Sequence, residues 1–139
     1  FGSNDAELLG AGIVPKQSFK NLGRLTPEAV AELMRKTDIF IDASTFQAMG
    51  LTAMEAMASG CVVIGPSEGG LPEITDRESG KPLAICVDTN SADTIFETCA
   101  ELIHDANRRE FLADRSLQVC HYHPLIAACR MLNVLFNDA

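Results

Sequence analysis

Three short apolar runs constrain the fold of this chain more than any other feature. They are Asp38–Asp42 (DIFID), Cys61–Gly65 (CVVIG) and Leu83–Asp88 (LAICVD). None of them alternates apolar with polar residues, and continuous apolar runs of this length are typical of strands buried on both faces of a parallel sheet. Parallel strands need long crossover connections, which are usually helices. The runs therefore predict an α/β protein.

The segments around these runs carry helix signals. Thr26 is a candidate N-cap, Pro27 suits the first helical position, and Glu28 suits the positive end of the helix dipole. These residues predict that the stretch 25–38 contains a helix, and the stretch 51–59 predicts a second helix between two of the strands. Further helices are predicted at 5–12, 91–104, 107–119 and 124–136, and a short strand at 18–22.

The alternation of helices and apolar strands predicts a doubly wound, Rossmann-like parallel sheet. The 139 residues suffice for one domain with its own core, so we expect one domain over 1–139. The opening Phe-Gly-Ser-Asn reads like a strand entering a turn, so we expect the domain to be truncated, with its first strand missing. Ligands of such sheets bind beyond the carboxyl ends of the strands. The stretches expected there are Gly23–Arg24, Ala43–Gly50 and Pro66–Gly70.

Composition excludes several classes of protein. The net charge is −8 and the eleven basic residues are scattered, which argues against a nucleic-acid partner. No apolar run approaches the roughly 18 residues of a transmembrane segment, and no signal peptide is visible. The five cysteines are odd in number and form no CxxC pair, which indicates a reduced, cytoplasmic protein. The stretch Cys120–His123 (CHYH) offers two histidines and one cysteine but no fourth ligand, so we expect no metal site.

The segment Ser44–Gly60 (STFQAMGLTAMEAMASG) carries the candidate chemistry. Gly50 precedes a predicted helix, whose first N–H groups can face an anion. Glu55 lies about one turn further on, where a carboxylate can accept hydrogen bonds from vicinal hydroxyls. The pattern alone leaves two interpretations open. Either Glu55 binds a ribose, or it has no such role and is partly exposed or caps a backbone N–H.

A longer stretch, Thr37–Ile74, resembles the C-terminal, nucleotide-sugar-binding domain of retaining glycosyltransferases with the GT-B fold, in the glycosyl transferases group 1 family. That family pattern has an apolar strand, a Pro/Ser turn, a Glu-x7-Glu motif around Phe-Gly-Leu, Glu-Ala-Met-Ala-x-Gly, a buried strand and Gly-Gly-x-x-Glu. The similarity extends over about Phe19–Val87. The positions that match in register are Ser44, Gly50, Leu51, Glu55, Ala56, Met57, Ala58, Gly60, Gly69, Gly70 and Glu73.

The resemblance implies a nucleotide-diphosphate sugar as the donor substrate, with no cofactor and no dedicated metal. Glu55 would hold the ribose hydroxyls. Backbone N–H groups at Gly50, Leu51 and Thr52 would meet the diphosphate. The other implied site residues are Gln47, a catalytic position at the donor sugar, Arg24, near the base, and Gly69 and Gly70, at the border of the pocket.

Two positions depart from the family pattern. Gln47 stands where the first Glu is usual, and Met49 replaces the usual Phe. A carboxamide can still hydrogen-bond sugar hydroxyls, but it cannot stabilise positive charge as a carboxylate does. Gln47 therefore keeps an alternative open: a degenerate, non-catalytic module that binds a nucleotide or mediates assembly.

The family's basic diphosphate-binding residues and its acceptor-binding N-terminal domain would precede the present start of the chain. We therefore expect the full-length protein to be a retaining glycosyltransferase and the isolated chain to be inactive, because transfer needs both substrates held together. Contact with a membrane surface, where there is one, is expected through the missing N-terminal domain.

Overall fold

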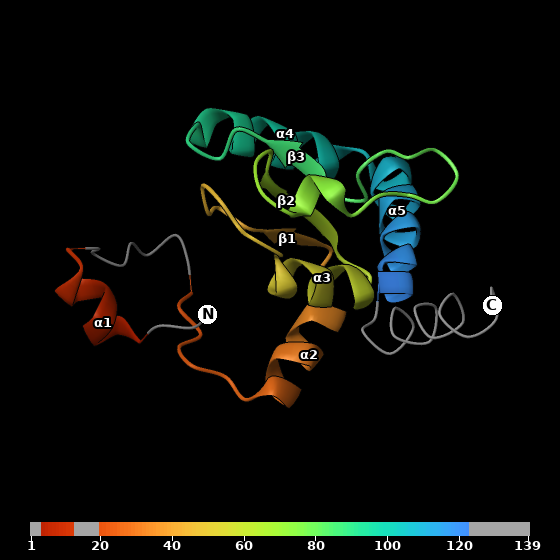
Figure 1. Ribbon diagram of the computed structural model, residues 1–139. Coiled ribbons are helices and arrows are strands. Elements are labelled where there is room, and N and C mark those ends of the chain that lie inside the picture. The colour runs from red at the N-terminus through yellow and green to blue at the C-terminus, as the bar shows by residue number, and fades with distance from the viewer. Residues whose placement is uncertain (1–3, 13–19, 123–139) are drawn as a thin grey trace, which may run out of the picture. The chain divides into compact units, whose positions relative to one another are not determined.

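The computed structural model describes residues 4–12 and 20–122 (Figure 1). The chain forms two compact units, residues 1–33 and 34–139. The predicted helix at 124–136 lies outside the described residues. That residues 1–139 form one truncated nucleotide-sugar-binding domain stays a prediction.

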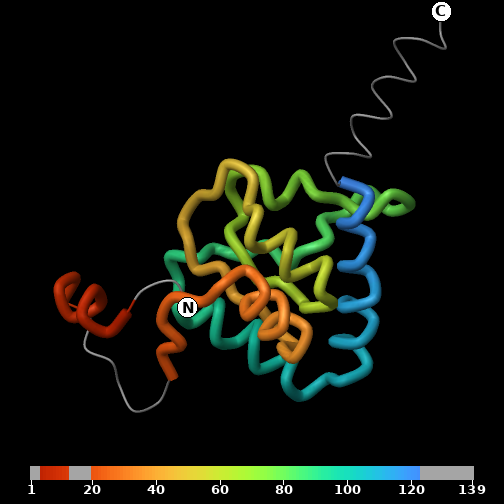
Figure 2. The backbone as a smooth tube through the Cα atoms, turned by 90° about the horizontal axis from the view of Figure 1, so that it is seen from below, coloured from red at the N-terminus to blue at the C-terminus, as the bar shows by residue number. Residues whose placement is uncertain are grey.

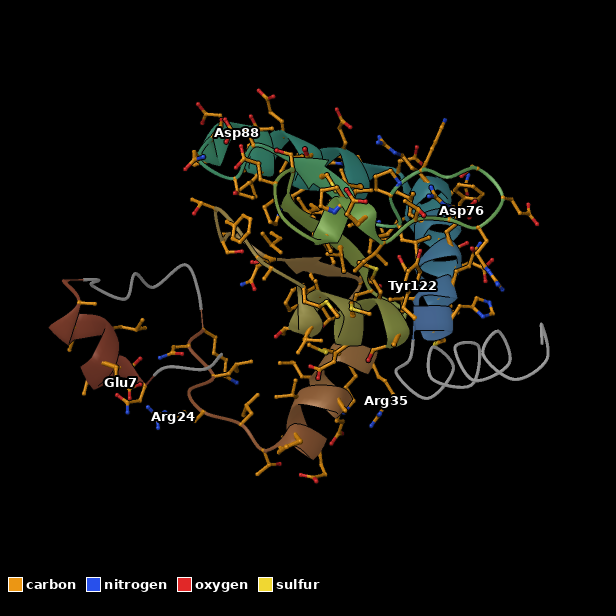
Figure 3. The ribbon with its side chains drawn as sticks, in the orientation of Figure 1. Glu7, Arg24, Arg35, Asp76, Asp88 and Tyr122 are labelled. Carbon is orange, nitrogen blue, oxygen red and sulfur yellow. The ribbon has the colours of Figure 1, made fainter. Side chains whose placement is uncertain are left out.

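Helix α1 (Asp5–Gly10) belongs to the first unit and begins with a capping box. The Asn4 side chain accepts a hydrogen bond from the Glu7 amide, and the Glu7 carboxylate accepts one from the Asn4 amide, both at 2.9 Å. This exchange satisfies two amide groups that a helix start otherwise leaves unpaired. The Glu7 carboxylate also pairs with the Arg24 guanidinium, and Figure 3 shows the two side chains pointing toward one another. The helix ends two residues earlier than predicted.

The strand predicted at 18–22 is wrong for its described part, because residues 20–22 form no strand. The Asn21 side chain accepts a hydrogen bond from the Gly23 amide at 3.0 Å and donates one to Asp5 at 2.6 Å. Gly23 has a φ of 65°, in the left-handed region that glycine adopts without strain. The Asn21 side chain thus supports a turn here, which competes with strand pairing.

Helix α2 (Pro27–Arg35) crosses the boundary between the two units. The Thr26 hydroxyl accepts a hydrogen bond from the Ala29 amide at 3.3 Å, so the predicted N-cap is confirmed. Glu28 lies in the first turn and Arg35 in the last. Each charge is opposite in sign to the nearer end of the helix dipole and therefore stabilises the helix.

The second unit is built on a three-stranded parallel sheet in the order β1 (Ile39–Ile41), β2 (Val62–Pro66) and β3 (Ile85–Val87). All five residues of β2 are buried, as expected for a central strand covered on both faces. The register pairs Ile39 with Val62, and Ile64 with Ile85. The predicted α/β class and the three apolar strands are confirmed, and each strand end differs from its predicted position by one or two residues.

Helices cover both faces of this sheet. Helix α3 (Leu51–Ala58) connects β1 to β2 on one face, and α4 (Ala92–His104) lies on the other (Figure 1). The α4 face buries Val62, Ile64 and Leu102 in one apolar cluster. Cys99 of α4 and Leu112 of α5 (Ala106–Ser116) pack against this cluster. Successive residues of β2 point to opposite faces, so the same strand supports both layers.

Two short 3-10 helices complete the second unit. One, η1 (Leu71–Glu73), follows β2, and its Leu71 is fully buried. The other, η2 (Leu117–Tyr122), continues from α5, so the helix predicted to reach residue 119 instead tightens after Ser116. In residues 4–12 and 20–122, no helix has the length and apolar character needed to cross a membrane.

A polar cluster fastens η2 to the segment between η1 and β3. The Asp76 carboxylate accepts hydrogen bonds from the Ser79 amide and hydroxyl, both at 2.7 Å, and from the Gln118 side chain at 2.8 Å. These bonds lower the pKa of Asp76 to about 2, the Ser79 amide contributing most. The Arg115 guanidinium adds a hydrogen bond of 2.8 Å to the Pro82 carbonyl, and its Nε lies 3.6 Å from Asp76. Asp76 lies far from Asp88, which follows the carboxyl end of β3 (Figure 3).

The cysteine Cys61 is buried beside β2, and its thiol donates to the Met34 carbonyl at 3.2 Å. Burial raises the pKa of Cys61, and the negative charge of Asp38 adds to the effect. Burial also raises the pKa of Cys86, which is half-buried. Both side chains are therefore held as thiols and act as small apolar groups, as the sequence predicted.

Candidate functional site

Three loops leave the sheet at the carboxyl ends of its parallel strands. They are residues 42–50 after β1, 67–70 after β2 and 88–91 after β3. Because all three strands run in the same direction, these loops share one edge of the sheet. Figure 2 shows the first two running beside one another, and a parallel bridge joins Gln47 to Gly69. This edge is where ligands of doubly wound sheets bind.

Helix α3 opens at this edge without a side-chain cap. Gly50 holds its N-cap position with φ 65° and ψ 44°, and no side chain accepts from the first turn. Within residues 4–12 and 20–122 it is the one α-helix that begins in this way. The other four have capping side chains from Asn4, Thr26, Ser91 and Asp105.

The start of α3 therefore carries an uncompensated positive potential. Helix geometry leaves the N–H groups of Leu51, Thr52 and Ala53 without intrahelical partners. The first turn contains no acidic residue, and both Leu51 and Thr52 are exposed. An arrangement of free amides, a positive dipole end and a glycine is a ready binding place for an anion such as a phosphate.

The loop after β2 is fitted closely against the loop after β1. The Gly70 amide donates a hydrogen bond of 2.8 Å to the Gln47 carbonyl. A Cβ atom on Gly69 would overlap the carbonyl of Gln47, and one on Gly70 would overlap the carbonyl of Ala48. Gly69 also has a φ of 90°, which disfavours any other residue. The two glycines therefore let the loops approach backbone to backbone, while the Gln47 side chain stays exposed.

A second set of contacts fixes the beginning of the first loop. The Asp42 carboxylate accepts hydrogen bonds from the Ser44 amide at 3.0 Å and from the Ser44 hydroxyl at 2.6 Å. The Ser44 carbonyl accepts a hydrogen bond of 2.6 Å from the Thr89 hydroxyl. Asp42 and Thr89 are site residues that sequence reasoning missed. The available signals were the Asp-x-Ser turn at the end of one strand and a hydroxyl residue two places beyond another strand.

Glu55 lies on α3, one turn beyond Leu51 and on the same side of the helix. Its carboxylate is exposed and, among the described residues, makes no hydrogen bond and no ion pair. The buried side of α3 is formed instead by Ala53, Ala56 and Met57. No described backbone N–H is capped by Glu55, so its carboxylate is available to a ligand.

The predicted site residues thus fall into two groups. The structure gathers most of them at one sheet edge: Gln47, Gly50, Leu51, Thr52, Gly69 and Gly70, with Glu55 on the helix that starts there. Arg24 belongs to the first unit, where it pairs with Glu7. The role of each residue toward a donor stays a prediction. In the described part of the chain, no three His, Cys, Asp or Glu side chains gather into a metal site.

The rim of the candidate site is apolar. Phe46, Met49 and Leu51 are 62%, 63% and 64% exposed, respectively. All three lie in the loop after β1 or at the first residue of α3. Gln47 is therefore a polar side chain between large apolar ones, at the edge where the free amides of α3 emerge.

The comparisons with known proteins agree with this architecture. The family model described as "Glycosyl transferases group 1" matches residues 14–118. A D-inositol 3-phosphate glycosyltransferase of Corynebacterium glutamicum is 32% identical over 124 residues, which cover 86% of this chain and 29% of the relative. An alpha-1,6-glucosyltransferase of Actinobacillus pleuropneumoniae is 44% identical over 61 residues, covering 44% of this chain and 18% of that protein.

A solved structure is similar as well. The C-terminal domain of a glycosyl transferase group 1 family protein from Francisella tularensis matches with a TM-score of 0.57 and 25% identity, covering 86% of this chain and 59% of that one. The chain spans less than a third of the length of the curated relatives it matches. The family indicated by the sequence is confirmed: this chain belongs to the glycosyl transferases group 1 family.

Proposed function

We propose that this chain is the donor-binding domain of a retaining glycosyltransferase and that it binds a nucleotide-diphosphate sugar. In the proposed complex, the diphosphate lies against the free amides of α3, the ribose against Glu55 and the donor sugar against Gln47. The rest of the enzyme supplies the acceptor-binding domain and the remaining contacts with the diphosphate.

The observation that carries this proposal is the uncapped start of α3. Side chains cap every other α-helix in the described residues, at a typical gain of about 1 kcal/mol each. The fifth α-helix, α3, has no side-chain cap and begins beside the close-packed Gly69–Gly70 loop. Its first amides are therefore available to bind another group. The overall charge of −8 calls for local positive potential wherever an anion binds, and the α3 dipole provides it.

The position of Glu55 supports the ribose contact. A carboxylate with no partner in the described protein can accept hydrogen bonds from two vicinal hydroxyls, and bonds to a charged acceptor are the stronger kind. Glu55 lies about 6 Å along the helix axis from Leu51, by the standard rise per residue. That separation is suited to a ligand whose phosphates meet the helix start and whose sugar follows the helix side.

The relatives include a D-inositol 3-phosphate glycosyltransferase and a sulfoquinovosyl transferase of Arabidopsis thaliana, the latter 24% identical over 90 residues. Their names differ in what is transferred or in what receives it. What these proteins share is glycosyl transfer, and the proposal for this chain is therefore confined to binding a nucleotide-diphosphate sugar.

A second candidate function rests on Gln47. A carboxamide at this position hydrogen-bonds a sugar but carries no charge to stabilise an oxocarbenium-like transition state. A module that binds nucleotide without catalysing transfer would tolerate this residue. Transfer activity of the full-length protein separates the two functions, because the non-catalytic module would bind the donor and transfer nothing.

Calorimetric titration of the 139-residue chain tests donor binding directly. We expect the chain to bind at least one of three pairs of probes saturably. The pairs are UDP and UDP-glucose, GDP and GDP-mannose, and ADP and ADP-glucose. The matching nucleoside without phosphates should bind at least about tenfold more weakly, because it makes no contact with the α3 amides. If the nucleoside bound as tightly as the diphosphate, the proposed place of the diphosphate would be wrong.

A further inference from the structure

The hydroxyl of Thr89 makes a long-range contact across the candidate site. It lies beyond the end of β3, yet it donates to the Ser44 carbonyl at 2.6 Å, 45 positions away in the sequence. Both residues are half-buried. The bond therefore connects the loop after the third strand to the loop that carries Gln47.

The donor side of this bond has firm support. The Asp88 carboxylate accepts a hydrogen bond from the Asn90 amide at 3.0 Å, and the Asp88 carbonyl accepts one from the Ser91 amide at 3.2 Å. Ser91 in turn caps α4, accepting from the Thr94 amide at 3.2 Å. Thr89 is thus enclosed in a turn between a strand and a capped helix.

The acceptor side is tied to the sheet. The Asp42 amide donates to the Ile64 carbonyl at 2.9 Å, which continues the pairing of β1 with β2. The Asp42 carboxylate then holds Ser44 by its amide and its hydroxyl. Ser44 is therefore held from its own strand by Asp42 and from the opposite edge strand by Thr89.

We infer that Thr89 is a positioning residue for the loop that carries Gln47. The loop is fastened at Ser44 by Asp42 and Thr89, and at Gln47 by Gly70, with two residues between these points. Two anchors this close fix the direction in which the Gln47 side chain leaves the backbone before any ligand arrives. Such preorganisation lowers the entropic cost of binding the sugar. This inference rests on the proposed function, because it concerns the sugar that Gln47 would contact.

The test compares three variants. Thr89→Val removes the hydroxyl and keeps the branched shape, whereas Thr89→Ser keeps the hydroxyl. Thr98→Val is the matched control, because Thr98 is also half-buried and its hydroxyl donates to a carbonyl at 2.8 Å, that of Thr94 in its own helix. The measured quantities are hydrogen exchange at the Ser44 and Gly70 amides, and the ratio of the dissociation constants for UDP and UDP-glucose, or for whichever of the three pairs the wild-type chain binds.

We expect Thr89→Val to accelerate exchange at both amides and to reduce the preference for the nucleotide sugar about fivefold, the effect of one hydrogen bond. The dissociation constant for the nucleotide alone should stay unchanged. Thr89→Ser should restore both quantities, and Thr98→Val should change neither. A merely structural role would lower thermal stability without changing the ratio.

The outcomes separate the two proposals. A wild-type chain that binds none of the six probes overturns the proposed function, and the positioning role falls with it. Wild-type binding with an unchanged ratio in Thr89→Val overturns the positioning role alone. That role is also overturned if Thr89→Ser behaves like Thr89→Val, or if Thr98→Val shows the same loss.

Discussion

The amide nitrogen of Gly70 lies 2.8 Å from the carbonyl oxygen of Gln47, and this hydrogen bond joins the loop after β2 to the loop after β1. It occupies the main chain of Gln47 and leaves the side chain exposed. Backbone position and side-chain chemistry at residue 47 can therefore be changed separately, the first through Gly70 and the second through Gln47 itself.

Gln47→Ala should weaken binding of the nucleotide sugar about fivefold, because one hydrogen bond to a sugar hydroxyl is lost. Binding of the bare nucleotide diphosphate should not change, since in the proposed complex only the sugar touches this side chain. Titration of the variant with both ligands measures the difference. Gln47→Asn retains the amide on a shorter side chain and serves as the control for amide chemistry. Equal losses for nucleotide and nucleotide sugar would contradict the assignment of Gln47 to the sugar.

Gly70→Ala should destabilise the chain by about 1–3 kcal/mol, the usual cost of forcing an added methyl group into a packed region. Gly70 has a φ of −81°, so the cost comes from overlap with the Ala48 carbonyl and not from backbone strain. Urea unfolding followed by circular dichroism measures this loss. Gly10→Ala is the control, because a Cβ atom there meets no atom within 4 Å. A Gly70→Ala variant as stable as Gly10→Ala would show that the two loops separate without cost.

Glu55→Ala should reduce nucleotide affinity at least about tenfold, because a hydrogen bond to a charged acceptor contributes on the order of 1.5 kcal/mol or more. Its free energy of unfolding should stay within about 0.5 kcal/mol of the wild-type value, since the carboxylate is exposed. Glu97→Ala, at an exposed position on α4, provides the matched control. Unchanged affinity of Glu55→Ala for a ligand that the wild type binds would remove Glu55 from the ribose site.

Acid should destabilise the second unit through Asp76. Its pKa is lowered to about 2 in the folded chain, below the value of about 3.9 for an unfolded chain. The folded state therefore binds the proton less readily. The resulting stabilisation is complete above about pH 4 and is lost as the pH falls toward 2. Asp76→Asn should flatten this dependence when the free energy of unfolding is measured from about pH 5 to about pH 2. Asp114→Asn, an exposed change on α5, should leave the wild-type slope.

The strands of the sheet could be predicted from the sequence because burial on both faces requires a continuous run of apolar residues. Continuous apolar runs such as CVVIG have few options other than a covered strand, and β2 is indeed buried throughout. The gathering of Gln47 with Gly69 and Gly70 was also foreseeable, since the carboxyl ends of parallel strands meet at one edge. The start of α2 was predicted from Thr26 because capping depends only on residues close together in the sequence.

The sequence offered signals for single polar residues such as Thr89, but it did not show which group each one would contact across the sheet. Thr89 and Ser44 are ordinary loop residues, and only the assembled sheet brings them to 2.6 Å. The strand predicted near Asn21 failed for the opposite reason. There the Asn21 side chain accepts a hydrogen bond from the Gly23 amide, a local contact that competes with strand pairing. Periodicity reports which side of an element is buried, and it contains no information about which polar groups meet across loops.

The uncapped start of α3 would separate two properties of a binding site: the anchoring of a charged group and the discrimination between sugars. Peptide N–H groups are the same whichever side chains Leu51 and Thr52 carry. Binding of a charged group by these amides therefore depends on the backbone conformation and not on the residue types. Discrimination between sugars, in contrast, would depend on the side chain at residue 47. In such a domain, the choice of donor can diverge through single substitutions while the anchoring of its charged part remains untouched.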